Sequence, residues 1–150
     1  MLRKYWLATL IAVGLFVLDR LTRIWAFQTG SKTLIPKLIL SSPIKNPGIA
    51  LGINLPFGQV TAILVSLILI GIVVWLAWHG WKQKNFFTWL SANLIFFGAM
   101  SNFLDRLVYG NVRDFLKFSF WPTTNNLGDL MVLIGVIILI LTFHSQNTKN

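Results

Sequence analysis

The sequence predicts an all-α membrane protein with four transmembrane helices, because it is far more apolar than a soluble domain of its length. Hydrophobic residues make up 55% of the 150 residues and charged residues only 11%, and the mean hydropathy is +0.70. The length suits a single domain. The apolar residues gather into four stretches, and crossing a bilayer takes roughly 20 such residues. The expected spans cover residues 5–27, 60–79, 86–104 and 127–143.

The first stretch has an alternative interpretation as a signal peptide. Arg3 and Lys4 precede an apolar run of suitable length, but no small-residue cleavage site follows it. The run continues instead into DRLTRIW, where Trp25 suits an anchor at the membrane interface. We therefore expect a span that the protein retains.

The remaining elements follow from length and composition. The second and third stretches meet in a tight turn at residues 80–85, and the fourth stretch must begin close to Asn126. Residues 28–59 are rich in proline and glycine, which predicts a loop with short extended pieces and a small sheet lying on the membrane. Residues 105–126 predict a loop with an amphipathic segment, DFLKFSFW, resting on the membrane interface.

Acidic residues are scarce and are all aspartates: Asp19, Asp105, Asp114 and Asp129. Consecutive spans alternate in direction, so the ends of the first and third spans and the start of the fourth face the same side. All four carboxylates therefore converge on one membrane face. His79 and His144 fall on the opposite face and cysteine is absent, which removes Ser-His and Cys-His nucleophilic schemes.

The net charge of +9 does not indicate binding to nucleic acid, because the basic residues are scattered at the ends of apolar runs rather than clustered in a stripe. Contact with anionic lipid headgroups explains them more simply. A count of basic residues does not distinguish the two membrane faces. The pair Arg3 and Lys4 and the compact turn with Lys82 and Lys84 favour the histidine side as cytoplasmic.

Each aspartate also has a purely structural interpretation. Asp19 and Arg23 are spaced i, i+4, as in a helical ion pair. Asp129 lies three residues after Asn126, as in a capped helix start. Asp114, in NVRDF, suits an ordinary loop charge. Asp105 shares one helix face with Asn102 and Arg106, just after the small residues of GAMS. This arrangement suits a polar network that ties helix ends together.

Ionisable groups at membrane depth are nevertheless costly and usually mark function. Two aspartates held close together share a proton, so that one acts as an acid and the other as a base. Such a pair can activate water against a peptide carbonyl and protonate the leaving amine without a metal. Two other functions use the same residues: a lipid phosphotransferase with aspartates on Mg²⁺, and a proton- or ion-coupled carrier. The carrier is disfavoured because carrier sites usually lie near the bilayer midplane.

Four strings occur in order along the chain: DRLTRIW, NPGIALGI, GAMSNFLDRLVYGNVRDF and NNLGD. Together they resemble the lipoprotein signal peptidase (signal peptidase II) family of bacterial inner-membrane aspartic peptidases. The resemblance runs from residue 19 to residue 129, and its NxxDRxxxGxVxDF pattern is specific. It implies four helices, both termini in the cytoplasm, and a small extracytoplasmic β-cradle from the first loop.

The resemblance also implies a function and the residues that perform it. The family cleaves diacylglyceryl-modified prolipoproteins just before the lipidated cysteine, at the outer face of the inner membrane. Its catalytic aspartates match Asp114 and Asp129. The residues that shape the site or bind substrate match Asp19, Arg23, Asn46, Gly48, Asn102, Asp105, Arg106 and Asn126. We expect no metal or other cofactor, no nucleic-acid partner, and a monomer that contacts membrane lipid and a prolipoprotein substrate.

Five positions depart from the residues usual in the family. Arg23 stands where lysine is common, Leu51 where phenylalanine is usual, and Arg113 at a usually apolar position. Asn125 and Gly128 replace a usual phenylalanine and alanine beside the second catalytic aspartate. The segment between the two catalytic aspartates is also short. We expect these departures to affect substrate fit and local order more than the catalytic pair.

Overall fold

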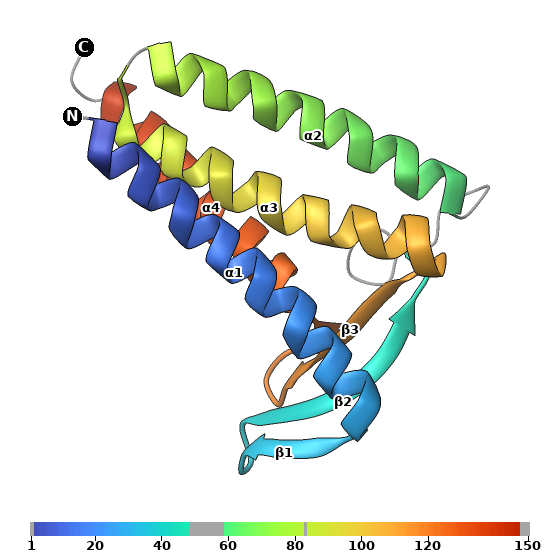
Figure 1. Cartoon of the computed structure of the whole chain (residues 1–150). Coiled ribbons are helices and arrows are strands. Elements are labelled where there is room, and N and C mark those ends of the chain that lie inside the picture. The colour runs from blue at the N-terminus through green and yellow to red at the C-terminus, as the bar shows by residue number, and fades with distance from the viewer. Residues whose placement is uncertain (1, 49–58, 83, 148–150) are drawn as a thin grey trace.

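The computed structural model describes residues 2–48, 59–82 and 84–147, which form a helical bundle with a small antiparallel sheet (Figure 1). The elements in chain order are α1 (Leu2–Thr29), β1 (Lys32–Ile35), β2 (Ile39–Asn46), α2 (Gln59–Lys82), α3 (Phe86–Tyr109), β3 (Val112–Phe118), β4 (Thr124–Asn125) and α4 (Leu127–Asn147). Each of the four expected spans lies within one of these helices.

The outer faces of the helices are apolar and exposed. Three helices in the described ranges are long and apolar enough to cross a membrane, at Val60–His79, Phe86–Tyr109 and Leu127–Ser145. Large apolar side chains such as Ile68 and Ile140 are more than 60% exposed on α2 and α4, as suits helices that cross a membrane. A fourth span in α1 stays a prediction.

Helix α3 is the centre of the bundle, because it packs against α1, α2 and α4. Its start is capped by the side chain of Asn85, whose oxygen accepts a hydrogen bond from the backbone N–H of Thr88 at 3.1 Å. Its end is capped by Gly110 in the left-handed conformation, at φ +73°. The helix therefore extends beyond the expected span and carries Asp105 and Arg106 in its last turns.

Glycines allow the backbones of α3 and α4 to come into close contact, as the small residues of GAMS predict. A Cβ atom added to Gly98 would lie 2.5 Å from the backbone oxygen of Gly128. A Cβ atom added to Gly135, two turns further along α4, would lie 2.6 Å from the side chain of Ile95. This close contact fixes the first turn of α4 against α3.

The sheet has the strand order β1-β2-β3-β4, and every pair is antiparallel. The first loop supplies β1 and β2 as expected, and residues 112–125 add β3 and β4, which the sequence did not predict. The DFLKF part of the DFLKFSFW segment belongs to β3, which pairs with β2. The place of this segment on the membrane interface stays a prediction. A two-stranded hairpin is marginal and leaves an open edge, whereas β3 covers that edge and buries Phe115 and Leu116 against Ala26.

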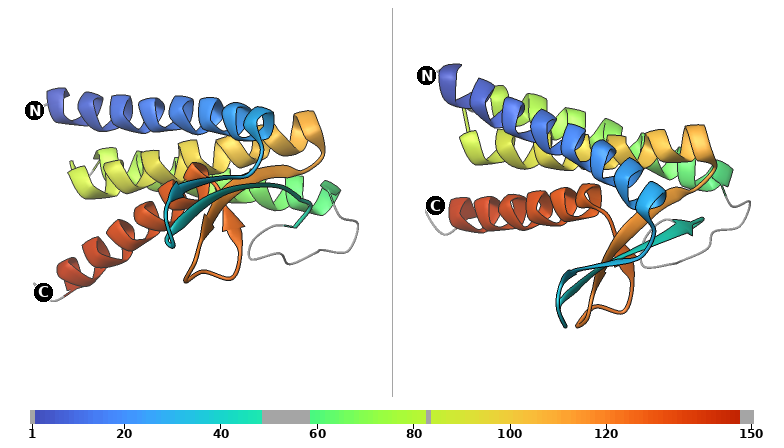
Figure 2. Two further views of the ribbon diagram at one scale, coloured as in Figure 1. Left: turned by 90° about the horizontal axis from the view of Figure 1, so that it is seen from below. Right: turned by 60° about the horizontal axis from the view of Figure 1, so that its bottom comes forward.

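The sheet lies at one end of the bundle, and the beginning of α1 and the end of α4 lie at the other (Figures 1 and 2). The turn between α2 and α3 is also at the end away from the sheet (Figure 1). This arrangement agrees with the alternating spans expected from the sequence. Leu51, one of the departures noted above, is outside the described residues.

Candidate functional site

Asp19, on the buried face of α1, joins three helices through its carboxylate. Its Oδ2 accepts hydrogen bonds from Arg23 Nε at 2.7 Å and from the hydroxyl of Ser101 on α3. Its Oδ1 accepts the backbone N–H of Gly128, at the start of α4, at 3.0 Å. The expected i, i+4 ion pair of Asp19 with Arg23 is therefore confirmed, and it forms part of a larger network.

Asp105 is surrounded by three guanidinium groups, two from α1 and one from β3. Its carboxylate oxygens lie 2.7 Å from Arg20 Nη1, 2.7 Å from Arg23 Nη1 and 3.1 Å from Arg113 Nη2. It also accepts the backbone N–H of Arg113 at 2.9 Å. The side chain is fully buried, so the cations compensate the desolvation of its charge.

Arg113, one of the departures noted above, places its guanidinium against two aromatic rings. The centre of its guanidinium lies 4.0 Å from the ring centroid of Tyr109 and 5.8 Å from that of Phe27. The aromatic faces and the carboxylate of Asp105 together explain how an arginine fits in this buried place. Arg113 thus ties β3 to α3 immediately before Asp114.

Asp129 lies in the first turn of α4 and is partly exposed. Its Oδ1 accepts a hydrogen bond from Asn102 Nδ2 at 2.7 Å, and its Oδ2 accepts the backbone N–H of Asn126 at 3.2 Å. The backbone N–H of Asp129 donates in return to Asn126 Oδ1 at 2.8 Å, which confirms the expected capped start. Arg23 Nη2 donates to Asn102 Oδ1 at 2.7 Å, so the amide of Asn102 must point its N–H toward Asp129.

Asp114 is on β3, only 1% exposed, and is held by two amides. Asn46 Nδ2 donates to its Oδ2 at 2.8 Å, and Asn126 Nδ2 donates to its Oδ1 at 2.6 Å. Asp114 pairs with Ile44 in the sheet, so Asn46 is its diagonal neighbour on the same face of β2. Burial, followed by the nearby negative charge of Asp129, raises the pKa of Asp114 to about 6.

The four carboxylates therefore fall into two chemical classes. Asp19 and Asp105 form ion pairs with arginines. Within the described ranges, neither Asp114 nor Asp129 has a Lys, Arg or His nitrogen within the 4.0 Å of an ion pair, and their side-chain donors are asparagine amides. Two carboxylates that lie near each other and lack an ion pair favour a shared proton, which is what acid–base chemistry requires.

Arg106 and Gly48 connect the end of β2 to α3. Arg106 Nη2 donates to the backbone oxygen of Gly48 at 2.9 Å, and Nη1 donates to the backbone oxygen of Asn102 at 3.4 Å. The backbone N–H of Gly48 donates to Asn46 Oδ1 at 2.9 Å, which turns the Asn46 amide N–H toward Asp114. The structure thus brings all ten residues that the sequence suggested for the site into one connected group.

Two further polar residues belong to this group and were missed. Arg20 is ion-paired with Asp105 and donates to the backbone oxygen of Ser101 at 3.1 Å. Ser101 itself binds Asp19. Arg20 could have been found, since α1 carries two arginines near one aspartate and the extra cation needs a carboxylate on another helix. Nothing in the sequence distinguishes Ser101 from an ordinary small helix residue.

The chemistry of this end of the bundle is that of carboxylates, amides and guanidiniums. His79 and His144 lie in the last turns of α2 and α4, away from the sheet. Among the described residues, no three His, Cys, Asp or Glu side chains are grouped so that they could hold a metal ion.

Comparison with known proteins identifies the family of the chain. The family model of signal peptidase (SPase) II matches residues 11–145. The lipoprotein signal peptidase of Pelagibacter ubique is 32% identical, covering 99% of this chain and 93% of its own length, and that of Syntrophomonas wolfei is 30% identical, covering 92% and 91%. A bacterial membrane enzyme solved by the in meso method at 2.3 Å resolution has a TM-score of 0.84 and 25% identity, covering 95% of this chain and 90% of that one. The chain belongs to the signal peptidase II family of membrane peptidases.

Proposed function

We propose that the protein is an aspartic endopeptidase that removes the signal peptides of diacylglyceryl-modified prolipoproteins, cutting just before the lipidated cysteine. The family membership and the names of the relatives support the substrate. The observation that carries the catalytic assignment is the bonding of the carboxylates. Asp114 and Asp129 are held by neutral amides, whereas Asp19 and Asp105 are ion-paired with arginines.

The proposed mechanism uses one proton shared by Asp114 and Asp129. The ionised carboxylate takes a proton from water as the water attacks the scissile carbonyl carbon, and the protonated partner donates to the carbonyl oxygen. The roles then exchange: as the C–N bond breaks, the carboxyl that took the water proton gives it to the leaving amine. The other carboxylate takes a proton back from a hydroxyl of the tetrahedral intermediate, so that the pair again shares one proton. The raised pKa of Asp114 supports a protonated acid in mildly acidic conditions, up to about pH 6.

The remaining polar residues position the pair and the substrate in this proposal. Asp19 and Arg23 orient the site, since Arg23 fixes Asn102, which in turn binds Asp129. Asn46 and Arg106 position the peptide backbone or the lipid headgroup. The substrate enters laterally from the bilayer, with its acyl chains lying between helices.

The proposed setting is the bacterial inner membrane, with α1 as a fourth span and the protein acting as a monomer. The sheet and the aspartates then face the extracytoplasmic side, and both termini face the cytoplasm. The cluster of basic residues at the other end of the bundle supports this direction, because cytoplasmic ends carry an excess of lysine and arginine: Arg3, Lys4, Lys82 and Lys84.

The test is cleavage of a lipidated precursor in liposomes by the wild type, Asp114→Asn and Asp129→Asn. Lys117→Gln is the matched control, since Lys117 lies on the same strand as Asp114 but binds the backbone oxygen of Pro122 instead of the carboxylate network. We expect both asparagine variants to lose cleavage and the control to retain it. Full activity of either asparagine variant would exclude the catalytic pair.

Two further arms of the same assay test the reaction class and the substrate. Excess chelator should leave the rate unchanged; loss of cleavage would favour a metal-dependent reaction. A precursor whose cysteine carries no diacylglyceryl group should be cleaved far more slowly. Equal cleavage of the two precursors would contradict the proposed role of the lipid.

A further inference from the structure

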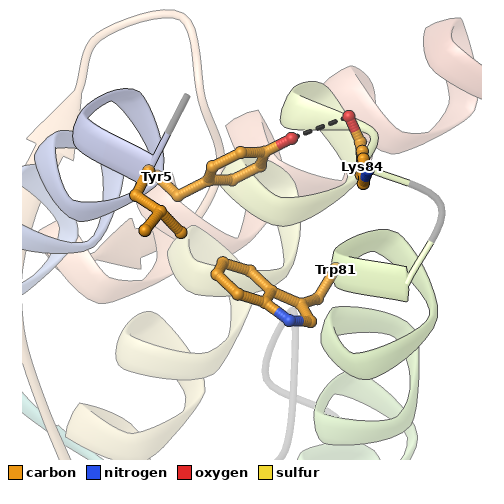
Figure 3. A pocket seen from close by; sticks show the side chains of 4 residues that line it. Tyr5, Trp81 and Lys84 are labelled. Carbon is orange, nitrogen blue, oxygen red and sulfur yellow. Dashed lines mark hydrogen bonds between the residues drawn. The ribbon is translucent and has the colours of Figure 1, made fainter.

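A small cavity lies at the end of the bundle opposite to the aspartates. Leu2 and Tyr5 at the start of α1, Trp81 at the end of α2, and Lys84 in the turn that follows surround a volume of about 150 Å³ (Figure 3). The proposed peptidase reaction uses none of these residues. The cavity therefore needs a separate explanation.

The wall of the cavity is rigid and aromatic. Tyr5 is buried, and its hydroxyl donates to the backbone oxygen of Lys84 at 2.7 Å. Its ring meets that of Trp81 edge-on, with centroids 5.4 Å apart, and Trp81 packs on Trp89 at 5.2 Å. The backbone N–H of Lys84 donates to the oxygen of Trp81 at 3.1 Å, which closes the turn. The wall of the cavity is thus held by the protein's own contacts.

The rim of the cavity is positively charged and has no acidic side chain to balance it. Lys84 lines the cavity, and Lys4 Nζ lies 5.4 Å from the ring centroid of Tyr5. Lys82, exposed beside them, places its Nζ 4.9 Å from the centroid of Trp78. All four acidic side chains of the chain belong to the network at the other end. Three lysines at this end of the bundle therefore carry positive charge that no acidic side chain balances.

We propose that this cavity is a binding site for an anionic phospholipid of the surrounding leaflet. The phosphate group lies among Lys4, Lys82 and Lys84, and the first part of one acyl chain enters the cavity between Tyr5 and Trp81. The volume is below the ~300–1,000 Å³ of pockets that enclose a drug-sized ligand, so the cavity holds only a segment of chain. Aromatic rings with a polar tip suit this depth of the membrane.

The test is native mass spectrometry of the detergent-solubilised full chain, titrated with phosphatidylglycerol and with phosphatidylcholine of the same acyl chains. We expect tighter binding of phosphatidylglycerol. The double variant Lys82→Gln/Lys84→Gln should lose about tenfold of this preference, since each lysine near an anionic surface contributes appreciably. The readout is lipid binding rather than cleavage, so failure here would leave the proposed peptidase function untouched.

The matched control is Lys32→Gln/Lys37→Gln, which removes the same charge from exposed positions at the opposite end. Lys37 resembles Lys84 in its backbone, since both have positive φ, at 60° and 54°. An equal loss of the preference for phosphatidylglycerol in the control would show that this preference follows from net charge alone, and would overturn the proposal. So would an undiminished preference in the Lys82/Lys84 variant.

A second pair of variants tests the apolar part of the site. Trp81→Ala should weaken the binding of both lipids, because it removes one wall of the cavity, whereas Trp75→Ala, on the same helix but outside the cavity lining, should not. Thermal melting of each variant checks that the fold is intact. Unchanged lipid binding by a folded Trp81→Ala variant would overturn the proposed place of the acyl chain.

Discussion

The side-chain amide of Asn126 donates a hydrogen bond to Oδ1 of Asp114 at 2.6 Å. The oxygen of the same amide caps α4 by accepting the backbone N–H of Asp129 at 2.8 Å. One asparagine therefore sets both the start of a helix and the relative position of the two carboxylates proposed for catalysis. Capping alone requires only an acceptor at this position, but the contact with Asp114 requires a donor as well.

Substitutions of Asn126 separate these two roles. Asn126→Asp keeps a good capping residue but replaces the donor with a second acceptor, so we expect cleavage to fall by roughly a hundredfold through misplacement of Asp114. Asn126→Ala should lose cleavage too, and in addition about 1 kcal/mol of unfolding free energy with the cap. The measurements are initial cleavage rates and thermal melting in detergent. Near-normal cleavage by Asn126→Asp would reduce this residue to a helix cap.

The pH profile should report the pKa of Asp114. Because the shared proton leaves as Asp114 ionises, kcat/KM should decline as the pH rises through about 6. The hydrogen bond from Asn46 lowers the pKa of Asp114, so Asn46→Ala should move this decline to higher pH. Thr33→Ala, on β1 of the same sheet, is the control and should not move it. A decline that stays in place or moves to lower pH in Asn46→Ala would contradict the assignment.

The same raised pKa has a consequence for stability. The unfolded chain releases the Asp114 proton near pH 4, whereas the folded protein keeps it to about pH 6. The stabilising contribution of the protonated group is therefore complete below pH 4 and is lost as the pH rises to 6, amounting to roughly 3 kcal/mol. Melting temperatures between pH 4 and pH 7 should fall for the wild type and fall less for Asp114→Asn.

Arg23 and Arg113 should differ sharply in their effect on stability, although both bind Asp105. Arg23→Met leaves Asp19 without its cation and Asn102 without the donor that orients it, so we expect a cost of roughly 3–5 kcal/mol. Arg113→Met leaves Asp105 with two guanidiniums, and we expect less than about 1.5 kcal/mol. Denaturant melts of the two variants in the same detergent measure the difference. Equal losses would show that the three arginines are interchangeable.

Gly128→Ala tests the close approach of α3 and α4. The new methyl group would lie 2.9 Å from Asn126 Oδ1, 3.0 Å from the backbone oxygen of Gly98 and 3.2 Å from Arg23 Nη2. We expect a loss of roughly 1–3 kcal/mol and reduced cleavage, since the first turn of α4 must shift. Gly71→Ala on α2 meets nothing within 4 Å and should gain about 0.5–1 kcal/mol. A neutral Gly128→Ala variant would contradict the packing described above.

The features that the sequence predicts correctly are local ones. The helices follow from apolar length, the ion pair of Asp19 with Arg23 from i, i+4 spacing, and the cap of Asn126 with Asp129 from i, i+3 spacing. The ion pair and the cap each depend on residues within one turn of a helix. The convergence of the aspartates also follows, because the alternation of spans needs no knowledge of side-chain contacts.

The features that sequence cannot supply depend on contacts between distant segments. Asp105 and Arg20 are 85 positions apart, and nothing local pairs them. The DFLKFSFW segment has an apolar face that suits either an interfacial helix or a strand, and the open edge of β2 decides between the two. The family resemblance divides the aspartates into two pairs, but the different bonding of the two pairs becomes visible only when the arginines are placed.

None of the four aspartates is exposed, and all of them belong to one hydrogen-bonded group. An ordinary domain of this length carries many acidic side chains on its surface, and their titration hides that of any single site. Here those aspartates are the only acidic side chains. Every proton that a carboxyl side chain of this protein takes up on acidification is therefore taken up within this one group.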